Sequence, residues 1–316
     1  MFESAELGHA IAAERYAAEV PALRESLLEA QFDLLQSKRF EVILIIAGMD
    51  GAGKGEAVNL LNEWMDPRHI QTQAPGAPNA LEQERPPMWR YWRALPPKGR
   101  IGIFFDALYT EAISDRVYDR SSNAELDQAL ERIKRFETML VDEGALVLKF
   151  WFHLARKDQK KRFENLEKDP ATRWRVTKAD WRNHEHYPDI RKVAERALRQ
   201  TSSAEAPWIV IEGRDFRYRN LTFGTTLLSA LQHRLQGDLA EMPRTTIPPI
   251  QPRIDQLNLL RCLDLSQSLE KMAYEKQLAH WQGELNRLSR RGKFGKLSVV
   301  VVFEGNDAAG KGGSIR

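Results

Sequence analysis

Hydrophobic and polar positions along the chain follow two distinct patterns. Residues 14–37 place apolar side chains three and four positions apart, which is typical of a helix with one buried face. The run EVILIIAG at 41–48 is apolar after Glu41 and rich in β-branched residues, which predicts a strand buried on both faces of a sheet. A glycine-rich turn and helical spacing over 56–65 follow, so strand, turn and helix begin a parallel α/β unit.

The same alternation continues through the first three quarters of the chain. The further predicted elements are a strand at 100–106, a helix at 124–142, a strand at 145–154, helical segments within 157–200, a strand at 207–213 and a closing helix at 221–235. Strands that alternate with helices predict an α/β fold, with a parallel sheet flanked by helices.

The first part of the pattern then repeats. A stretch with four prolines and little periodicity between 237 and 255 predicts a linker. After it, 274–288 resembles 16–30, and 296–313 resembles 39–56 at nearly the same offset. Two matches at one offset indicate a tandem duplication of a domain.

Composition excludes several classes of protein. The 316 residues are 42% hydrophobic and 29% charged, an ordinary globular mixture that argues against disorder. A net charge of +3 excludes a highly basic nucleic-acid coat. Cys262 is the single cysteine and cannot form an internal disulfide. The apolar runs are far shorter than the roughly 20 residues that span a bilayer, and the N-terminus lacks a signal pattern. We expect a soluble, cytoplasmic protein that binds neither nucleic acid nor membrane.

The turn after 41–48 carries the clearest chemical signal. Gly48 to Lys54 fits the pattern GxxxxGK between a buried strand and a helix, and the pattern recurs at 305–311. Glycines let the backbone N–H groups point at phosphate oxygens, while Lys54 reaches the outer phosphates. The alternative, a glycine-rich turn with an incidental lysine, does not explain why the pattern occurs twice. The predicted phosphate-binding positions are Gly48, Met49, Gly51, Ala52, Gly53 and Gly55 in the first loop and Gly305, Asn306, Ala308, Ala309, Gly310, Gly312 and Gly313 in the second.

Carboxylates near the loops are the candidate metal ligands. Gly55 and Gly312 stand where nucleotide hydrolases place the Ser or Thr that binds Mg²⁺, so a carboxylate must hold the ion instead. Asp106 ends the strand at 100–106 and is the predicted Mg²⁺ ligand, with Asp50 as a second candidate, although an aspartate there could also only cap a helix. The predicted catalytic residues are Asp50, Lys54, Asp106, Asp307 and Lys311.

These motifs together resemble the polyphosphate kinase 2 family. The resemblance rests on GxDxAGKGG, the FD strand end, the run KFWFH at 149–153 and Arg173-Trp174, and it covers nearly all of 14–235 plus the repeat from about 257. The fused pair of domains resembles the AMP-directed class of that family. The resemblance implies a P-loop kinase fold with a helical lid, and Mg²⁺-dependent transfer of a terminal phosphoryl group from inorganic polyphosphate to AMP, giving ADP. It also implies that Lys149 and Arg173 lie near the phosphate path.

The first copy departs from the family after Asp106. Where the family has a stretch like RSWYNRAG, this chain has Ala107 and Ala112 in place of both arginines and Glu111 in place of asparagine. Glu56 replaces the glycine that the repeat keeps as Gly313. A carboxylate about 5 Å from a phosphate charge costs on the order of 3 kcal/mol at an effective dielectric constant of about 20. We expect the first domain to bind or transfer phosphate poorly and the second to be the active copy.

Clustered cations suggest where a polyphosphate chain would run. Residues 156–182 contain ten Lys or Arg against five acids, which suits linked phosphates, although any single one of them could equally belong to a solvated helix face. Arg85, Arg90 and Arg93 precede the strand at 100–106, where the resemblance places the acceptor. His184 and His186 lack a third spaced ligand, so we expect no metal site there.

The expected organisation is a first P-loop domain over 1–240, a Pro-rich linker over 241–255, and the start of a second domain over 256–316 that stops six residues after Gly310. We therefore expect a fragment of a longer protein. Two alternatives stay open: an ATP-dependent nucleoside monophosphate kinase, and a non-catalytic module for polyphosphate binding or oligomerisation. The sequence also leaves homo-oligomerisation open.

Overall fold

The computed structural model describes residues 1–237, 266–304 and 314. The chain divides into two compact units, Met1–Thr246 and Ile247–Arg316. The predicted linker over 241–255 lies outside the described residues, and so does the second glycine loop.

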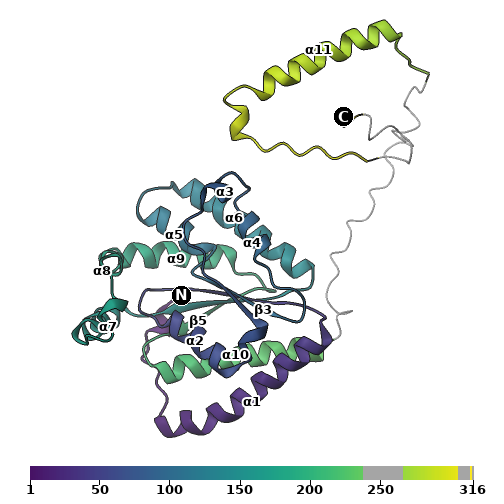
Figure 1. The fold of residues 1–316 in the computed structure, drawn as a ribbon. Helices are drawn as coiled ribbons and strands as arrows, with labels where there is room; N and C mark the ends of the chain where they lie inside the picture. The colour runs from purple at the N-terminus through teal and green to yellow at the C-terminus, as the bar shows by residue number, and fades with distance from the viewer. Residues whose placement is uncertain (238–265, 305–313, 315–316) are drawn as a thin grey trace. The chain divides into compact units, whose positions relative to one another are not determined.

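A five-stranded parallel sheet forms the centre of the first unit (Figure 1). The strands are β1 (Val42–Gly48), β2 (Ile70–Gln73), β3 (Ile101–Phe105), β4 (Leu146–His153) and β5 (Trp208–Glu212), in the order β2-β3-β1-β4-β5. Six of the seven residues of β1 are buried, as its continuous apolar run predicts. The register places Ile46 opposite Phe105 of β3 and Phe150 of β4. The predicted α/β class with a parallel sheet is confirmed.

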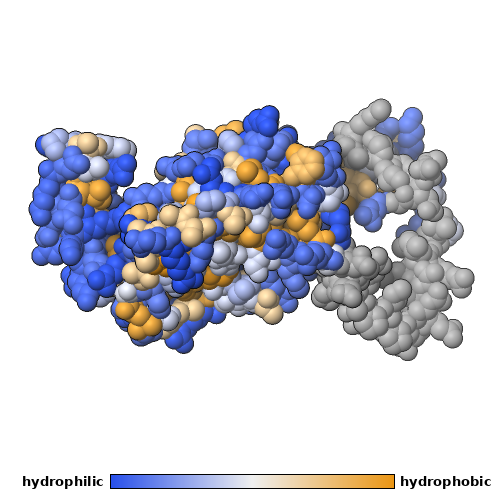
Figure 2. Space-filling view, turned by 90° about the horizontal axis from the view of Figure 1, so that it is seen from below, coloured by the Kyte–Doolittle hydropathy of each residue, from blue (hydrophilic) through white to orange (hydrophobic). Residues whose placement is uncertain are grey.

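Helices cover both faces of this sheet. On one face α1 (Ala13–Ser37), α2 (Lys54–Trp64) and α10 (Phe216–Gln236) contact one another, and on the other face α5 (Tyr109–Val117), α6 (Asn123–Asp142) and α9 (Tyr187–Thr201) do so (Figure 1). From the side of α1, mostly hydrophilic residues surround scattered hydrophobic ones (Figure 2). No helix in the described part of the chain is long and apolar enough to cross a membrane.

The other described helices of the first unit lie outside these two groups. They are η1 (Glu3–Ala5), η2 (Pro67–His69), α3 (Ala80–Gln83), α4 (Trp89–Arg93), α7 (Arg156–Lys168), η3 (Arg173–Arg175) and α8 (Lys178–Glu185). The segment α7–η3–α8 leaves the carboxyl end of β4 and returns to the sheet layer through α9 (Figure 1). Thr177 starts α8 with a reciprocal side-chain cap to Asp180, which fixes where the segment turns back.

The order of the strands determines where a site can form. The connection from β1 leads toward β2 on one side, whereas the connection from β3 crosses to β4 on the other. In open α/β sheets, ligands bind outside the carboxyl ends of strands at such a reversal. The glycine-rich loop (48–54) follows β1 and Asp106 follows β3, so both lie at this point.

The described part of the second unit holds α11 (Lys271–Ser289) and η6 (Phe294–Lys296). No residue of α11 is buried. The apolar run at 297–303 resembles β1 in sequence, yet within the described residues it is exposed and pairs with no strand. A strand buried on both faces forms only against neighbouring strands, because its backbone groups need partners.

Candidate active site

The glycine-rich loop curls tightly after β1. Gly48, Gly51 and Gly53 all have positive φ angles, at 147°, 74° and 88°. A Cβ atom at Gly48 would lie 2.2 Å from the Phe152 carbonyl oxygen on β4, so no other residue fits there. The Met49 N–H donates to the same carbonyl at 2.9 Å, which fastens the loop to β4.

Lys54 is the first residue of α2, and its side chain turns back into the loop. Its Nζ donates to the Gly48 carbonyl at 2.7 Å and lies 2.9 Å from Asp106 Oδ1 and 3.9 Å from Asp50 Oδ1. Burial opposes the charge, since the side chain is only 9% exposed, but Asp106 and Asp50 outweigh it and raise the pKa of Lys54. The ammonium group is therefore charged and held between the two aspartates.

Asp106 stands in an uncommon backbone conformation directly after β3. Its φ is 45°, and that of Leu108 is 59°, both in the left-handed region that non-glycine residues rarely adopt. The Asp106 N–H donates to Ile46 O at 2.9 Å, and the Leu108 N–H donates to the Tyr91 hydroxyl at 3.2 Å. Such strained positions persist only when their surroundings hold them, and they cluster at functional sites.

Asp50 connects the glycine-rich loop to α7 and α8. The Asn183 amide of α8 donates to Asp50 Oδ2 at 2.7 Å, and the Gln159 amide of α7 donates to the Asp50 carbonyl at 2.8 Å. Gln159 is buried and also contacts His184 Nδ1 at 2.7 Å. No sequence motif points to Gln159 or Asn183, because single amides carry no periodic or spacing signal.

These groups surround a cavity of about 150 Å³. It is lined by Gly48, Met49, Asp50, Lys54, Asp106, Thr110, Ile113, Ser114, Val117, Tyr118, Trp151, Gln159, Asn183 and Ile190. The predicted residues Asp50, Lys54 and Asp106 thus meet in one place, as their positions after β1 and β3 require.

Asp50 and Asp106 fit the donor set that Mg²⁺ prefers. Mg²⁺ is commonly held by one or two carboxylates together with substrate phosphates rather than by an all-protein cage. Within the described residues, no group of three or more His, Cys, Asp or Glu could hold a metal. A phosphate ligand would therefore have to complete the coordination of an ion here.

Glu56 lies in the first turn of α2, and three arginines surround its carboxylate. Its carboxylate is 2.7 Å from Arg162 of α7, 3.7 Å from Arg175 of η3 and 3.0 Å from Arg219 of α10. Burial alone would raise the pKa of Glu56, but Arg162 and Arg219 outweigh burial and the pKa lies below its ordinary value. No sequence pattern singles out Arg219, because nothing in 216–236 distinguishes it from other charged positions.

The predicted contact of Lys149 with phosphate is wrong. Lys149 is fully buried on β4, with its Nζ 2.7 Å from Glu137 Oε2 and 2.6 Å from the Thr201 carbonyl. The Tyr109 hydroxyl donates to the other oxygen of Glu137 at 2.7 Å. Side chains alternate along a strand, and Lys149 points into the layer of α6 and α9 rather than toward the glycine-rich loop. Lys149 and Glu137 form a buried ion pair within the core.

The remaining predicted cations lie on the surface or in a second pocket. Arg173 is exposed on η3, and its phosphate role stays a prediction. Arg85 and Arg90 line a pocket of about 350 Å³, which Glu111 and Ala112 also line. Arg93 lies instead over the Trp89 ring, at 4.7 Å.

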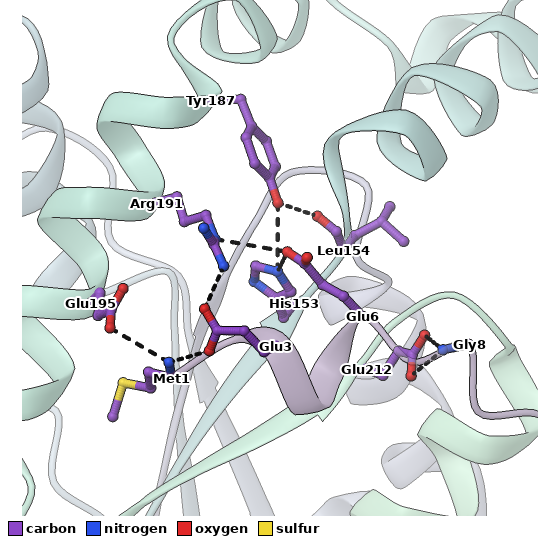
Figure 3. Close-up of polar contacts among 10 residues, drawn as sticks. All are labelled: Met1, Glu3, Glu6, Gly8, His153, Leu154, Tyr187, Arg191, Glu195 and Glu212. Carbon is purple, nitrogen blue, oxygen red and sulfur yellow. Dashed lines mark hydrogen bonds and ion pairs between the residues drawn. The ribbon is translucent and has the colours of Figure 1, made fainter.

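An N-terminal strap (residues 1–12) covers the carboxyl ends of β4 and β5 (Figure 3). Phe2 stacks on His153 with 4.5 Å between ring centroids, and Glu6 Oε1 lies 2.8 Å from His153 Nε2. Glu212 accepts from the Gly8 N–H at 2.9 Å. Next to it, a Cβ at Gly213 would lie 2.3 Å from the Ala52 carbonyl, so the strap's anchors adjoin the glycine-rich loop.

The second loop lies outside the described residues. This applies to Gly305, Asn306, Asp307, Ala308, Ala309, Gly310, Lys311, Gly312 and Gly313. Their roles stay predictions.

Known proteins resemble this chain in both sequence and fold. The family described as Polyphosphate kinase 2 (PPK2) matches residues 10–238 and 268–316. The chain is 52% identical over all its 316 residues to a polyphosphate:AMP phosphotransferase of Pseudomonas aeruginosa, and it spans 64% of that protein, less than two thirds. It is 29% identical over 297 residues to a polyphosphate:AMP phosphotransferase of Acinetobacter johnsonii, with 92% of this chain and 58% of that protein covered.

Solved structures agree with this. A crystal structure described as a polyphosphate kinase 2 from Pseudomonas aeruginosa superimposes with a TM-score of 0.84 at 49% identity, covering 100% of this chain and 61% of that one. One from Arthrobacter aurescens gives a TM-score of 0.69 at 28% identity, covering 75% and 84%. The chain belongs to the polyphosphate kinase 2 family.

Proposed function

We propose that this chain is part of a polyphosphate:AMP phosphotransferase, which transfers a terminal phosphoryl group from inorganic polyphosphate to AMP with Mg²⁺. The observation that carries the proposal is the meeting of Lys54, Asp50 and Asp106 beside the glycine-rich loop. Relatives that match the whole chain have this activity in their names. The proposal includes a P-loop kinase fold with α7–η3–α8 as its lid, and a duplicated domain.

The residues of the glycine-rich loop would bind and orient the donor. Lys54 donates a hydrogen bond to Gly48 O and forms an ion pair with Asp106, and its ammonium group has three donors, so it can also donate to a phosphate oxygen. The loop amides add donors at the positive end of α2. Phosphoryl transfer depends mostly on such positioning and on charge, so no covalent nucleophile is needed.

Asp106 and Asp50 would hold Mg²⁺ together with the substrate phosphates. When bound, the ion would neutralise charge on the phosphoryl oxygens. Asp50 is kept in place by Asn183 and Gln159, so it would orient the acceptor phosphate or accept its proton.

We propose further that this first copy is the weaker one and that the second copy carries most of the catalysis. In the first copy, the pocket lined by Arg85 and Arg90 is the candidate acceptor site. Glu111 and Ala112 stand there where the family resemblance expects polar and cationic groups. Arg90 in that pocket already lies 3.5 Å from Glu82. Arginines lost from a phosphate site remove charge-assisted bonds of about 1.5–3 kcal/mol each. These features favour a first copy that binds phosphate but transfers it slowly.

The experiment compares this chain with a protein extended through a complete second domain, each given polyphosphate, AMP and Mg²⁺. ADP from the longer protein, with little from this chain, is expected. Lys54→Ala in the longer protein should leave its rate nearly unchanged. Turnover with ATP as the only accepted donor would refute polyphosphate as donor, and a rate abolished by Lys54→Ala would refute the division between the copies.

A further inference from the structure

Three arginines from three separate elements converge on one carboxylate in the first unit. Arg162, Arg175 and Arg219 come from α7, η3 and α10, and all three lie within 3.7 Å of Glu56. Three positive charges against one negative charge leave an excess of two. Such a site is built for more anionic charge than Glu56 supplies.

The buried guanidinium of Arg219 is already in position to bind an anion. Its side chain is 1% exposed, and its Nη1 lacks a hydrogen-bond partner among the described residues. The guanidinium lies against the glycine-rich loop, because a Cβ at Gly53 would come within 1.7 Å of Nη1. A buried guanidinium nitrogen without a partner is costly, and an oxygen of an anion would satisfy it.

This cluster is separate from the cavity around Lys54. Neither Glu56 nor any of the three arginines lines that cavity. Residues two apart on a helix do not face each other, so Lys54 and Glu56 leave α2 in different directions. An anion bound by the arginines would therefore lie in a different direction from a phosphate bound at Lys54.

We propose that Glu56 is a built-in substitute for a phosphate group: it occupies an arginine subsite that would otherwise take one phosphoryl unit of an inorganic polyphosphate. The carboxylate and a phosphate present the same kind of oxygen to a guanidinium fork. Glu56 thereby excludes the polyanion and at the same time ties α7 and η3 to α2. The choice of polyphosphate as ligand rests on the proposed function, whereas the competition between Glu56 and an anion rests on geometry alone.

Titration calorimetry with inorganic tripolyphosphate tests this on the whole chain. Glu56→Gln keeps the shape of the side chain and removes its charge, so it should bind tripolyphosphate roughly tenfold or more tightly than the wild-type chain. Glu63→Gln, which removes a charge from an exposed position on the same helix, should change the affinity by less than about twofold. Adding Arg162→Ala to Glu56→Gln should abolish the gain.

Hydrogen exchange gives a second readout that does not depend on affinity. Amides of α7 should exchange faster in Glu56→Gln, since the tie from α2 is weakened, and tripolyphosphate should restore their protection. Equal affinities for Glu56→Gln and Glu63→Gln, or a gain that survives Arg162→Ala, would overturn the proposal. An equal gain for citrate would overturn phosphate as the ligand class. Failure of the proposed function would show separately, as absence of ADP from the longer protein.

Discussion

Lys54 and Asp106 form an ion pair of 2.9 Å that joins the loop after β1 to the end of β3. The two residues are 52 positions apart in sequence, but β1 and β3 are neighbours, so their carboxyl ends meet. Among the described residues, Lys54 is the only cation that lines this cavity, and the pair holds it against the candidate metal ligand. A phosphate that binds here must share Lys54 with Asp106, which links phosphate binding to the state of that carboxylate.

Asp106→Asn tests that link. The substitution removes the charge that would hold Mg²⁺, so the Mg²⁺ affinity measured in the presence of tripolyphosphate should fall by about tenfold or more. Asparagine also tolerates the left-handed backbone, so the fold should be kept. Asp119→Asn is the matched control, since Asp119 has a similar φ of 52° but lies exposed on the surface. Equal Mg²⁺ affinities for the two variants would contradict a metal role for Asp106.

Gly48→Ala and Gly55→Ala test whether the backbone conformation of the loop requires glycine at its first position. Gly48 has a φ of 147°, and a Cβ there would lie 2.2 Å from a backbone oxygen, so alanine should destabilise the fold by at least about 1–3 kcal/mol. Gly55 is helical and its nearest contact would be 3.9 Å away, so alanine there should be neutral or stabilise by up to about 1 kcal/mol. Urea unfolding measures both. Equal stabilities would show that the loop has no need of glycine at its start.

Lys149→Met tests whether Lys149 belongs to the core or to the phosphate path. Removing one partner of a buried ion pair leaves Glu137 without its countercharge, which should cost about 3–5 kcal/mol of unfolding free energy. The double variant with Glu137→Leu should recover much of that loss. Tripolyphosphate affinity, measured on the folded protein, should not change. Weakened binding without loss of stability would return Lys149 to the phosphate path.

Sequence patterns predict most of this fold because the decisive elements are strongly patterned. β1 and β4 are nearly continuous apolar runs, and α6 has the regular spacing of an amphipathic helix. β2 is not predicted, because it has four residues at the edge of the sheet and only Ile70 is buried. A short edge strand gives too few alternations to be recognised.

The candidate site is only partly predictable. Spacing identifies Asp50, Lys54 and Asp106, since a glycine-rich loop and a strand end have fixed places in an α/β sheet. The partners Asn183 and Arg219 reach the site from distant helices, and their approach depends on tertiary packing. The prediction for Lys149 fails for the same reason: the strand is right, but the buried partner Glu137 lies on another element.

His153 should make the stability of the first unit depend on pH. Burial lowers the pKa of His153 below 6.5, although Glu6 opposes the shift. The unfolded chain therefore binds more protons than the folded chain below pH 6.5, and stability is lost as the pH falls from 6.5 toward the folded pKa. One such proton is worth at most about 1.4 kcal/mol per pH unit.

Urea unfolding at about pH 7.5, 6.5 and 5.5 measures this, with His153→Gln as the comparison. His184, whose pKa burial also lowers, is present in both proteins and contributes equally. The wild-type chain should lose more stability between the two lower pH values than the variant does. A steeper loss in His153→Gln would mean that the strap contact with Glu6, and not burial, controls the ionisation of His153.

We expect the glycine-rich loop to bind a polyphosphate, and backbone amide resonances report such binding at the loop itself. Glycine-selective ¹⁵N labelling reports the amides of Gly51, Gly53 and Gly55 in a chain titrated with tripolyphosphate and Mg²⁺, with assignments made from glycine-to-alanine variants. These three resonances should shift with saturation, while those of Gly144 and Gly237, beside the amino end of β4, stay fixed. Shifts confined to Gly144 and Gly237, with the loop glycines unmoved, would contradict binding at the loop.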